Sequence, residues 1–502
     1  MGNGCHPYAI GQGHRQPARD IDRIKIKVGN RENGAAFRWV DSADVQTQTQ
    51  PADAFKLDRM TNLNYFGYLK EIQTPELSVS LAGTPQQQLA AAIQAVRDVE
   101  AAQIDPIRDE EAVIESELND TIDSEKTVLT YEQKQLRRKL AKTPGVAALE
   151  SRLGEIETRL EELLSRENEL KETSHDLAGQ RTTAERELRS NVAVFVDSHG
   201  HEQPIQLLDI VRFTCPNQMG VGAKMGHYGA KVWEMLWDDP REANQDGGLF
   251  PAIFGTVLMV FLMAATCFPL GVLAGIYLGE YAKEGPMVRL VRVAVNNLAG
   301  IPSIVYGIFG LGFFIYICGG SLDHWLFPAW VDAGKPVFGQ GCIFWASLTL
   351  GLLTIPVVIV STEEALMAIP RDVRESSYAL GSTKFQTLIR ILVPMASPGM
   401  MTGFILAMAR AAGEVAPLMI TGAVKSAPVP LDGDFPFVRL DRQFMHLGFH
   451  IFDISCKSPN VEATKPMVYV TTLLLLLIVL GLTSVAIVLR NRMRKRFELR
   501  TI

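Results

Sequence analysis

The 502-residue sequence has little cysteine, no excess of basic charge and no nucleotide-binding loop. Its six cysteines are scattered, without a C-x-x-C pair or metal-ligand spacing, so we expect isolated thiols packed as small apolar groups. The net charge of −6 gives no basis for nucleic-acid binding, which requires a strongly basic surface. The pattern G-x-x-x-x-G-K-[ST] is absent, so we do not expect this chain itself to bind ATP. No catalytic constellation stands out, and an enzyme is not expected.

Long apolar runs are missing from residues 1–248 and dominate residues 249–490. Five stretches are each long enough to cross a bilayer, which takes about 20 residues. They are 250–279, 293–318, 342–361, 394–422 and 467–489. We therefore expect a mainly α-helical protein, with a polytopic membrane helix bundle in residues 249–490 and a polar extramembrane domain before it.

A basic cluster at residues 490–496 lies directly after the last apolar stretch. The positive-inside rule therefore places the basic tail, residues 491–502, in the cytoplasm. Counting back through five spans places the loop 362–393 inside and everything before residue 249 outside.

That external placement requires an export device. The first 240 residues contain no segment apolar enough to be a signal peptide or a leading span. We therefore expect that a leading membrane helix is missing from the chain. The alternative keeps the polar half in the cytoplasm, and it requires one of the five stretches to be re-entrant.

Residues 86–190 have the pattern of a helical hairpin. Thr84-Pro85 provides an N-cap followed by proline at the first helical position, and Pro144-Gly145 breaks the helical run. After this break, apolar residues recur at alternating intervals of three and four, which is the seam of a coiled coil. They begin with Val146, Leu149, Leu153, Ile156, Leu160 and Leu163. The first arm is less regular, and the short turn predicts antiparallel packing.

Strand-like segments flank this hairpin at 24–28, 37–40, 76–81 and 192–196. The coiled coil is therefore expected to be inserted into a small β-rich domain made from residues 1–85 and 191–215. Residues 216–248 form a connector or interfacial segment. The turn with His199 and His201 is expected to be solvated, and a two-histidine metal pair is the alternative.

The loop 362–393 carries the pattern E-S-S-x3-G-x9-I-x-V-P. Glycine permits a sharp break between two helices, and small side chains let a partner approach closely. The leading glutamate can pair with a basic residue of a partner, and the proline is expected to begin the next span. The candidate docking residues are Glu375, Ser376, Ser377, Gly381, Ile391 and Pro394. An ordinary amphipathic inner loop is the alternative.

This pattern resembles the EAA loop of ATP-binding-cassette importer permeases, E-A-A-x3-G-x9-I-x-L-P, with serines for the alanines and Val393 for leucine. In that family the loop forms short helices that dock in a groove of the ATPase. The segments GTVLMVFLMAATCFPLGVLAGIYLGEY, NNLAGIPSIVYGIFGLG and ARAAGEVAPLM are similar to PstA-type permeases of phosphate importers. That resemblance covers most of residues 245–490. The family core has six spans, and the large polar domain resembles the long variant of some bacteria with two membranes.

The resemblance implies a permease subunit of a bacterial inner-membrane importer of inorganic phosphate. It implies that ATP and Mg²⁺ are bound by a cytoplasmic ATPase dimer and that this chain holds no cofactor of its own. The further partners would be membrane lipid, a second, PstC-like permease and a periplasmic phosphate-binding protein. The alternatives are a permease for another oxyanion or small solute, and a membrane-anchored coiled-coil signalling or scaffold protein.

Arg410 and Glu414 are the ionisable residues of most interest within an apolar stretch. Their spacing of four predicts that they pair on one helical face. Charges at membrane depth are costly and usually face a cavity or a partner. Arginine can offer bidentate hydrogen bonds to phosphate, so we expect the pair to lie on the substrate path, with Asn296 and Asn297 as weaker candidates. The alternative is a structural ion pair that locks two helices.

Overall fold

The computed structural model divides into two compact units. Unit 1 comprises residues 1–101 and 185–225, and unit 2 comprises residues 102–184 and 226–502. The residues that the structure describes are 23–28, 30, 36–45, 47, 49–61, 64–75, 77, 82–143, 146–198, 200–241, 244–431, 437–458 and 461–498.

Unit 1 is built on a five-stranded antiparallel sheet with the strand order β6-β5-β4-β3-β7. Strand β4 pairs with β5, with Tyr68 opposite Val196. The segments before and after the predicted hairpin therefore form one sheet. The predicted β-rich domain is therefore present. Its strands are β3 Phe55–Arg59, β4 Tyr65–Gln73, β5 Val192–Val196, β6 Glu202–Gln206 and β7 Ile210–Thr214, and β1 Arg23–Val28 pairs with β2 Ala36–Asp41 in a separate hairpin.

Helix α1, Pro85–Val99, begins with the predicted cap. The Thr84 hydroxyl accepts a hydrogen bond from the Gln87 backbone N–H, and the Gln87 side chain accepts one from the Thr84 N–H. The buried face of α1, which includes Leu89 and Val96, belongs to unit 1 and not to the hairpin in which the sequence pattern places it. The π-helical turn η3, Glu100–Ile104, separates α1 from the helices of the hairpin.

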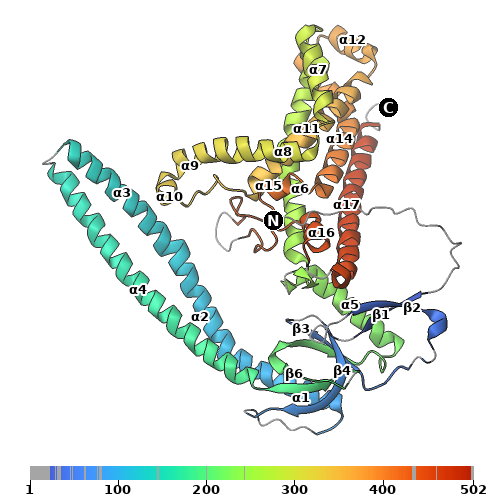
Figure 1. The fold of residues 1–502 in the computed structure, drawn as a ribbon. Helices are drawn as coiled ribbons and strands as arrows, with labels where there is room; N and C mark the ends of the chain where they lie inside the picture. Colours follow the sequence, from blue (N-terminus) through green and yellow to red (C-terminus); the bar gives the residue numbers. More distant parts are fainter. Residues whose placement is uncertain are drawn as a thin grey trace, which may run out of the picture. The chain divides into compact units, whose positions relative to one another are not determined.

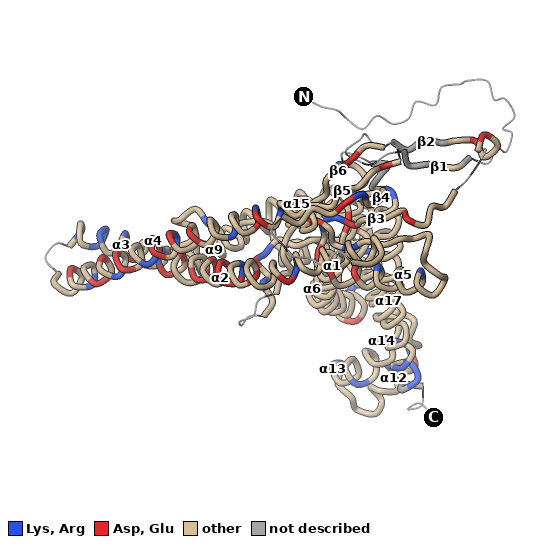
Figure 2. Tube along the Cα trace, turned by 90° about the horizontal axis from the view of Figure 1, so that it is seen from below, with Lys and Arg blue, Asp and Glu red and all other residues tan. Residues whose placement is uncertain are grey.

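The arms consist of an interrupted first helix and an uninterrupted second one. The first arm is α2 Asp105–Ser116, the π-helical turn η4 Glu117–Ile122, and α3 Asp123–Lys142; the second is α4 Ala147–Arg189. The two arms run side by side (Figure 1), and both charge signs alternate along them (Figure 2). The predicted turn at Pro144-Gly145 lies outside the described residues.

Unit 2 also contains five helical runs long and apolar enough to cross a membrane within the described ranges: Phe250–Tyr281, Ser303–Leu326, Ile343–Met367, Lys384–Gly413 and Thr464–Lys495. The number of spans predicted for these residues is confirmed. Their elements are α6 Phe250–Ile276 with η7 Tyr277–Tyr281, α8 Ser303–Phe309 with η8 Gly310–Gly319 and α9 Gly320–Leu326, α11 Ile343–Met367, α13 Lys384–Thr387 with η9 Leu388–Leu392 and α14 Val393–Gly413, and α17 Val461–Glu498. The shorter elements are η2 Ser42–Asp44, η5 Leu207–Asp209, α5 Val221–Trp237, β8 Pro240–Arg241, β9 Asp246–Gly247, α7 Pro286–Leu298, α10 Pro328–Asp332, α12 Arg371–Ala379, α15 Leu418–Thr421 and α16 Leu447–Cys456.

Two of the predicted spans have wrong boundaries. The stretch 293–318 is not one helix, because α7 ends at Leu298 and a new helix starts at Ser303. Pro302 explains this break, since the residue before a proline avoids the helical conformation. The stretch 394–422 also breaks, because α14 ends at Gly413 and only the short α15 comes after it in that stretch.

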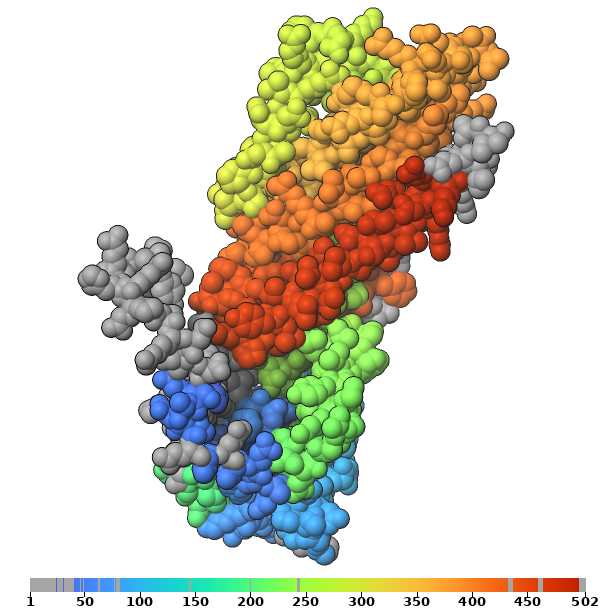
Figure 3. Space-filling model, turned by 90° about the vertical axis from the view of Figure 1, so that its right-hand side faces the viewer, coloured from blue at the N-terminus to red at the C-terminus, as the bar shows by residue number. Residues whose placement is uncertain are grey.

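Helix α11 lies at the centre of the bundle, where it packs extensively against α6 and α14. Glycines permit the close approach to α6: a Cβ on Gly271 would lie 2.7 Å from the Val358 Cβ, and one on Gly275 would lie 2.6 Å from the Thr362 Cβ. Small residues spaced by four are a general means of helix packing in membranes. On its other side α14 is covered by α17, which Figure 3 shows lying along it.

Candidate functional site

The loop between α11 and α14 forms two short helices, α12 and α13, joined by a tight turn. Gly381 in this turn has φ +84°, a conformation that glycine adopts at little cost. Thr383 caps α13 through a reciprocal pair of hydrogen bonds with Gln386. Residues 380–383 thus provide the sharp break that the sequence predicted at the glycine.

The loop residues predicted to face a partner divide into two groups. Glu375 and Ser376 are exposed, whereas Ser377 is buried and its hydroxyl lies 2.8 Å from the Thr387 hydroxyl. The expectation that Ser377 presents a small surface to a partner is therefore wrong, because its side chain joins α12 to the end of α13. Ile391 is half-buried within η9.

Pro394 is the second residue of α14, Val393–Gly413, as the prediction that it begins the next span requires, but α14 continues a longer helical run. The helical run starts ten residues earlier, at Lys384, and Pro394 lies in its interior. A proline inside a helix removes one hydrogen bond and clashes with the carbonyl four residues before it. The π-helical turn η9, Leu388–Leu392, covers that carbonyl, and its wider spacing accommodates the proline ring.

Exposed apolar side chains surround the loop's charged residues, and the sequence reasoning missed them. Leu380 is 88% exposed and Phe385 is 64% exposed, and Tyr378 and Ile389 are also exposed. A cluster of exposed large apolar side chains marks a site of interaction more often than isolated ones do. Their signal in the sequence was the presence of large apolar residues at the turn of a loop that is otherwise polar.

Arg410 and Glu414 do pair, but not on one helical face. The Arg410 Nε lies 3.5 Å from Glu414 Oε1, and both side chains are partly buried. Glu414 lies just beyond the end of α14 in an extended conformation, with ψ 135°. The pair therefore stands at the break between α14 and α15. Discontinuous helices of this kind often form binding sites in transporters.

The break at Arg410 is closely packed from one side by α8. A Cβ on Gly307 would lie 2.7 Å from the Pro417 Cα, which is close to Glu414 in sequence. The Tyr306 hydroxyl donates a hydrogen bond of 2.7 Å to the Leu298 carbonyl and so bridges the other helix break, between α7 and α8. Both breaks thus involve the same short helix.

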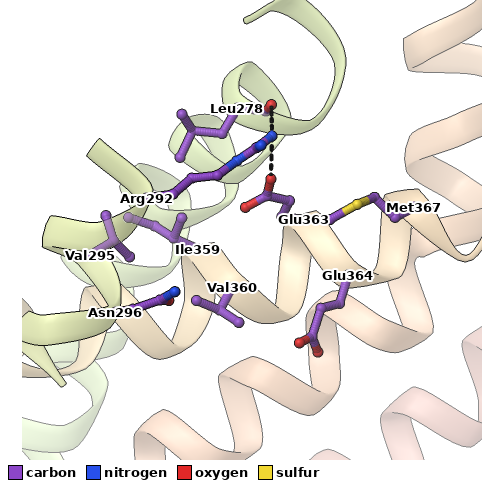
Figure 4. A pocket seen from close by; sticks show the side chains of 9 residues that line it. All are labelled: Leu278, Arg292, Val295, Asn296, Ile359, Val360, Glu363, Glu364 and Met367. Carbon is purple, nitrogen blue, oxygen red and sulfur yellow. Dashed lines mark hydrogen bonds and ion pairs between the residues drawn. The ribbon is translucent and has the colours of Figure 1, made fainter. Parts of the chain in front are cut away.

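A separate cavity of about 220 Å³ lies between α7 and α11 (Figure 4). Arg292 enters it from α7, and its Nη2 lies 2.8 Å from Glu363 Oε1 on α11. A hydrogen bond with Glu284 raises the pKa of Arg292. Asn296, a weaker candidate for the substrate path, lines this cavity. Since Glu363 and Glu364 also line it, the cavity is poorly suited to an anion.

No group of three or more potential ligands among the described residues could hold a metal ion. His201 lies 3.2 Å from Asp197 Oδ2, and His199 falls outside the described residues. The described cysteines are free thiols; Cys215, Cys267 and Cys342 are buried as expected, whereas Cys318 is only partly buried and Cys456 is exposed. Cys5 is outside the described ranges.

Comparison with known proteins gives the class of this protein. A family described as "Binding-protein-dependent transport system inner membrane component" matches residues 271–495. The phosphate transport system permease protein PstA of Yersinia pestis is 33% identical over 248 residues, which cover 49% of this chain and 74% of that protein. PstA of Mycobacterium leprae is 37% identical over 174 residues, which cover 35% of this chain and 51% of that protein. A solved structure of the MetNI methionine ABC transporter in an inward-facing conformation has 18% identity, covers 49% of this chain and 95% of that chain, and gives a TM-score of 0.36.

The chain belongs to this family of inner-membrane transport components, and it is a PstA-type permease by its relatives within the family. It is a multi-pass membrane protein. The chain spans about half the length of the mycobacterial relatives that it matches.

Proposed function

We propose that this chain is the transmembrane permease subunit of an ATP-driven importer of inorganic phosphate. The observation that carries the proposal is the 33% identity over 248 residues to a phosphate permease, which cover 74% of that protein. The chain itself would hold no cofactor, and it would take up energy from ATP and Mg²⁺ bound by a partner.

The coupling to that partner is assigned to the loop around Glu375 and Gly381. A cytoplasmic ATPase dimer would bind the exposed surface formed by Leu380 and Phe385, which is apolar and flanked by the exposed Glu375. Exposed apolar side chains supply most of the energy of such interfaces, and a neighbouring charge supplies specificity.

The substrate path is assigned to Arg410 and Glu414. The arginine is partly exposed at a break in α14, where it can donate to phosphate oxygens. Glu414 pairs with the same guanidinium, and its competition with phosphate would keep the anion from binding too tightly. A purely structural pair is the competing interpretation.

The remaining assignments concern orientation and partners. The C-terminus would be cytoplasmic and the N-terminal domain periplasmic. A second, PstC-like permease would complete the pore, and a periplasmic binding protein would deliver phosphate. Protease treatment of spheroplasts, in which the outer membrane has been opened, tests the orientation, since cleavage of the polar half only after lysis of the inner membrane would exclude a periplasmic location.

The arms are assigned as an antiparallel coiled coil. Buried residues recur every seven positions along α4, at Ile156, Leu163, Leu170 and Leu177. A seven-residue period of buried side chains is the pattern of a coiled-coil seam. Cysteine pairs placed across the seam would test this packing by cross-linking.

Residues 216–248 are assigned as an interfacial segment. Tyr228, Trp233 and Trp237 of α5 are exposed, and Trp237 stacks on Phe250 at the first turn of the first described span. Tryptophan and tyrosine are enriched where spans leave the hydrocarbon. A spin label at Tyr228 should therefore be accessible to oxygen and protected from a water-soluble relaxation agent.

Uptake of labelled phosphate tests the function directly. In cells that depend on this transporter, Arg410→Gln should reduce uptake at least about tenfold without changing membrane insertion. Arg289→Gln, the same change at an exposed position of α7, is the matched control and should transport normally. Undiminished uptake by Arg410→Gln would remove this residue from the path, and stronger inhibition by sulfate or molybdate than by unlabelled phosphate would change the assigned solute.

A further inference from the structure

A single arginine joins the loop helix α12 to the ends of two spans. The Arg374 Nε and Nη2 lie 3.2 and 2.6 Å from Glu280 Oε1, at the end of the first described span. Its Nη1 and Nη2 also donate to the carbonyls of Ile369 and Leu366, at the C-terminal end of α11, over 2.7 and 2.8 Å. All three guanidinium nitrogens are thus engaged. The planar guanidinium suits such multiple bonding, and a cation is favourable at a helix C-terminus.

The second loop helix, α13, contacts the same end of the first described span. Lys384, the first residue of α13, donates from its Nζ to the Glu280 carbonyl over 2.5 Å. Its Nζ also lies 4.7 Å from the centre of the Tyr281 ring. Both loop helices therefore contact η7, Tyr277–Tyr281, through residues that the docking pattern does not include.

The ion pair of Arg374 with Glu280 is largely shielded from water, whereas Lys384 is exposed. The Arg374 and Glu280 side chains are only 18% and 10% exposed. Removing one partner from an ion pair with this degree of burial costs more than removing one from a surface pair, because the other charge is left uncompensated. Rigid contact is therefore expected between the loop and η7.

The π-helical turn η7, which the loop contacts, continues directly from α6, which packs closely against α11. From η7 back along α6, Gly275 and Gly271 bring α6 directly against α11. A displacement of α12 would consequently be passed to α6 and α11 together. The loop could not slide on them without breaking the bonds of Arg374.

We propose that Arg374 and Glu280 are positioning residues that transmit movement of the loop to the α6–α11 pair. The inference rests on the proposed function, because it needs an ATPase that moves the loop. Neither residue is assigned to ATPase docking or to the solute. Loss of the pair would leave the ATPase bound and hydrolysing, while the spans no longer move with it.

The test uses the complete transporter, co-purified with its ATPase and reconstituted in proteoliposomes. The variants are Glu280→Gln, Arg374→Gln and the double variant. Arg371→Gln is the matched control, since it removes the same charge from an exposed position of the same helix. Glu280→Gln keeps the shape of the side chain, so it remains informative if Arg374→Gln folds poorly.

Each single variant should retain its ATPase and transport about tenfold less phosphate per ATP, and the double variant should show the same loss rather than its square, since the two residues act through one another. Unchanged transport per ATP in either single variant overturns the inference. A multiplicative loss in the double variant also overturns it. Loss of the bound ATPase would assign the pair to docking and likewise contradict it.

A second measurement does not depend on the solute. Spin labels at Phe261 on α6 and Leu477 on α17, both exposed, report the distance between these helices in a cysteine-free background. ATP should change this distance in the wild-type complex but not in Glu280→Gln. A wild-type complex that shows this change without transporting phosphate would refute the proposed cargo and leave the transmission role standing. An equal change in Glu280→Gln would refute the transmission role alone.

Discussion

The pair of arms and the bundle of membrane helices differ in the contacts that fix the register of their helices. Between the arms, arginines at positions 152, 159 and 166 of α4 pair with glutamates at positions 132, 125 and 117 of the first arm. Between α6 and α11, glycines allow direct contact of the helices. In water a charge ladder selects one register at little net energy, whereas in lipid close packing is the main attraction available.

The first arm also contains one residue more than the second between two rungs of this charge ladder. The arginines of the ladder are spaced seven and seven apart, whereas the glutamates are spaced seven and then eight apart. The additional residue falls in the π-helical turn η4, Glu117–Ile122. A π-helical turn accommodates one additional residue without ending the helix, so the ladder stays in register. The glycine contacts of the bundle, at Gly271 and Gly275, lie in the regular α-helix α6, ahead of the π-helical turn η7.

The largest expected effect is therefore a small-to-large change in the bundle. Gly275→Leu would place a side chain where a Cβ already lies 2.6 Å from Thr362 Cβ and 2.8 Å from the Ile359 carbonyl. Overpacking of this kind costs about 3 kcal/mol, and we expect the yield of monodisperse protein in size-exclusion chromatography to collapse. Gly481→Leu, where nothing lies within 4 Å, is the control. Equal yields for both variants would contradict the close packing of α6 on α11.

The second largest effect is expected at Gly381 in the loop. This glycine is needed because of its backbone conformation and not because a larger side chain would clash. Gly381 has φ +84° with open space around it, so Gly381→Asp should distort the turn without a clash. We expect the permease to insert normally and to lose most of its co-purifying ATPase. Gly285→Asp introduces the same charge at an extended glycine and should retain the ATPase. Full ATPase stoichiometry in Gly381→Asp would exclude the docking assignment.

A milder effect is expected in the arms. Deletion of Asp120 from η4 should convert the π-helical turn to regular α-helix and leave the ladder intact. Deletion of Gln133 from α3 should instead rotate the helix on one side of it by one residue and mismatch the seam. Hydrogen exchange of α4 peptides in the whole protein reports both outcomes. Faster exchange after the Asp120 deletion than after the Gln133 deletion would show that η4 is required for the packing.

The smallest effect is a pH dependence of the arms. Hydrogen bonds from Arg159 and Arg137 lower the pKa values of Glu125 and Glu157, and a hydrogen bond from Lys126 lowers that of Glu167. A carboxyl whose pKa is lowered by folding contributes stability that is present above its unfolded pKa and is lost as the pH falls through the folded value. Protection from exchange, corrected for the intrinsic pH dependence of amide exchange, should therefore fall in α4 below about pH 4.5 while protection in α11 stays constant. An equal loss of protection in α11 would show that the pH dependence does not come from the ion pairs of the arms.

Some features of the structure could be predicted from the sequence, and others could not. The five apolar runs were found because length and hydropathy suffice to recognise them. The strand β3, FKLDR, was missed because a short strand with charged residues carries no clear alternation. Gly381 was identified correctly at the turn, whereas the burial of Ser377 depends on Thr387, a tertiary contact that the pattern E-S-S does not encode.

The pairing of Arg374 with Glu280 could not have been predicted. The two residues are 94 positions apart, and each lies next to a charged or aromatic residue that was an equal candidate. The break before Glu414 was missed for a different reason. A spacing of four suggests one helical face only while the helix continues, and the stop signals at Gly413 and Pro417 were given too little weight against that spacing.

The uninterrupted second arm sets a fixed length in the molecule. Helix α4 has 43 residues, so at 1.5 Å per residue it is about 65 Å long, roughly twice the thickness of the hydrocarbon core of a bilayer. A rod of this length acts as a spacer. Whatever binds near its tip can be held at a distance from whatever binds at its base, and removing whole heptads from both arms would shorten that distance in known steps of about 10 Å.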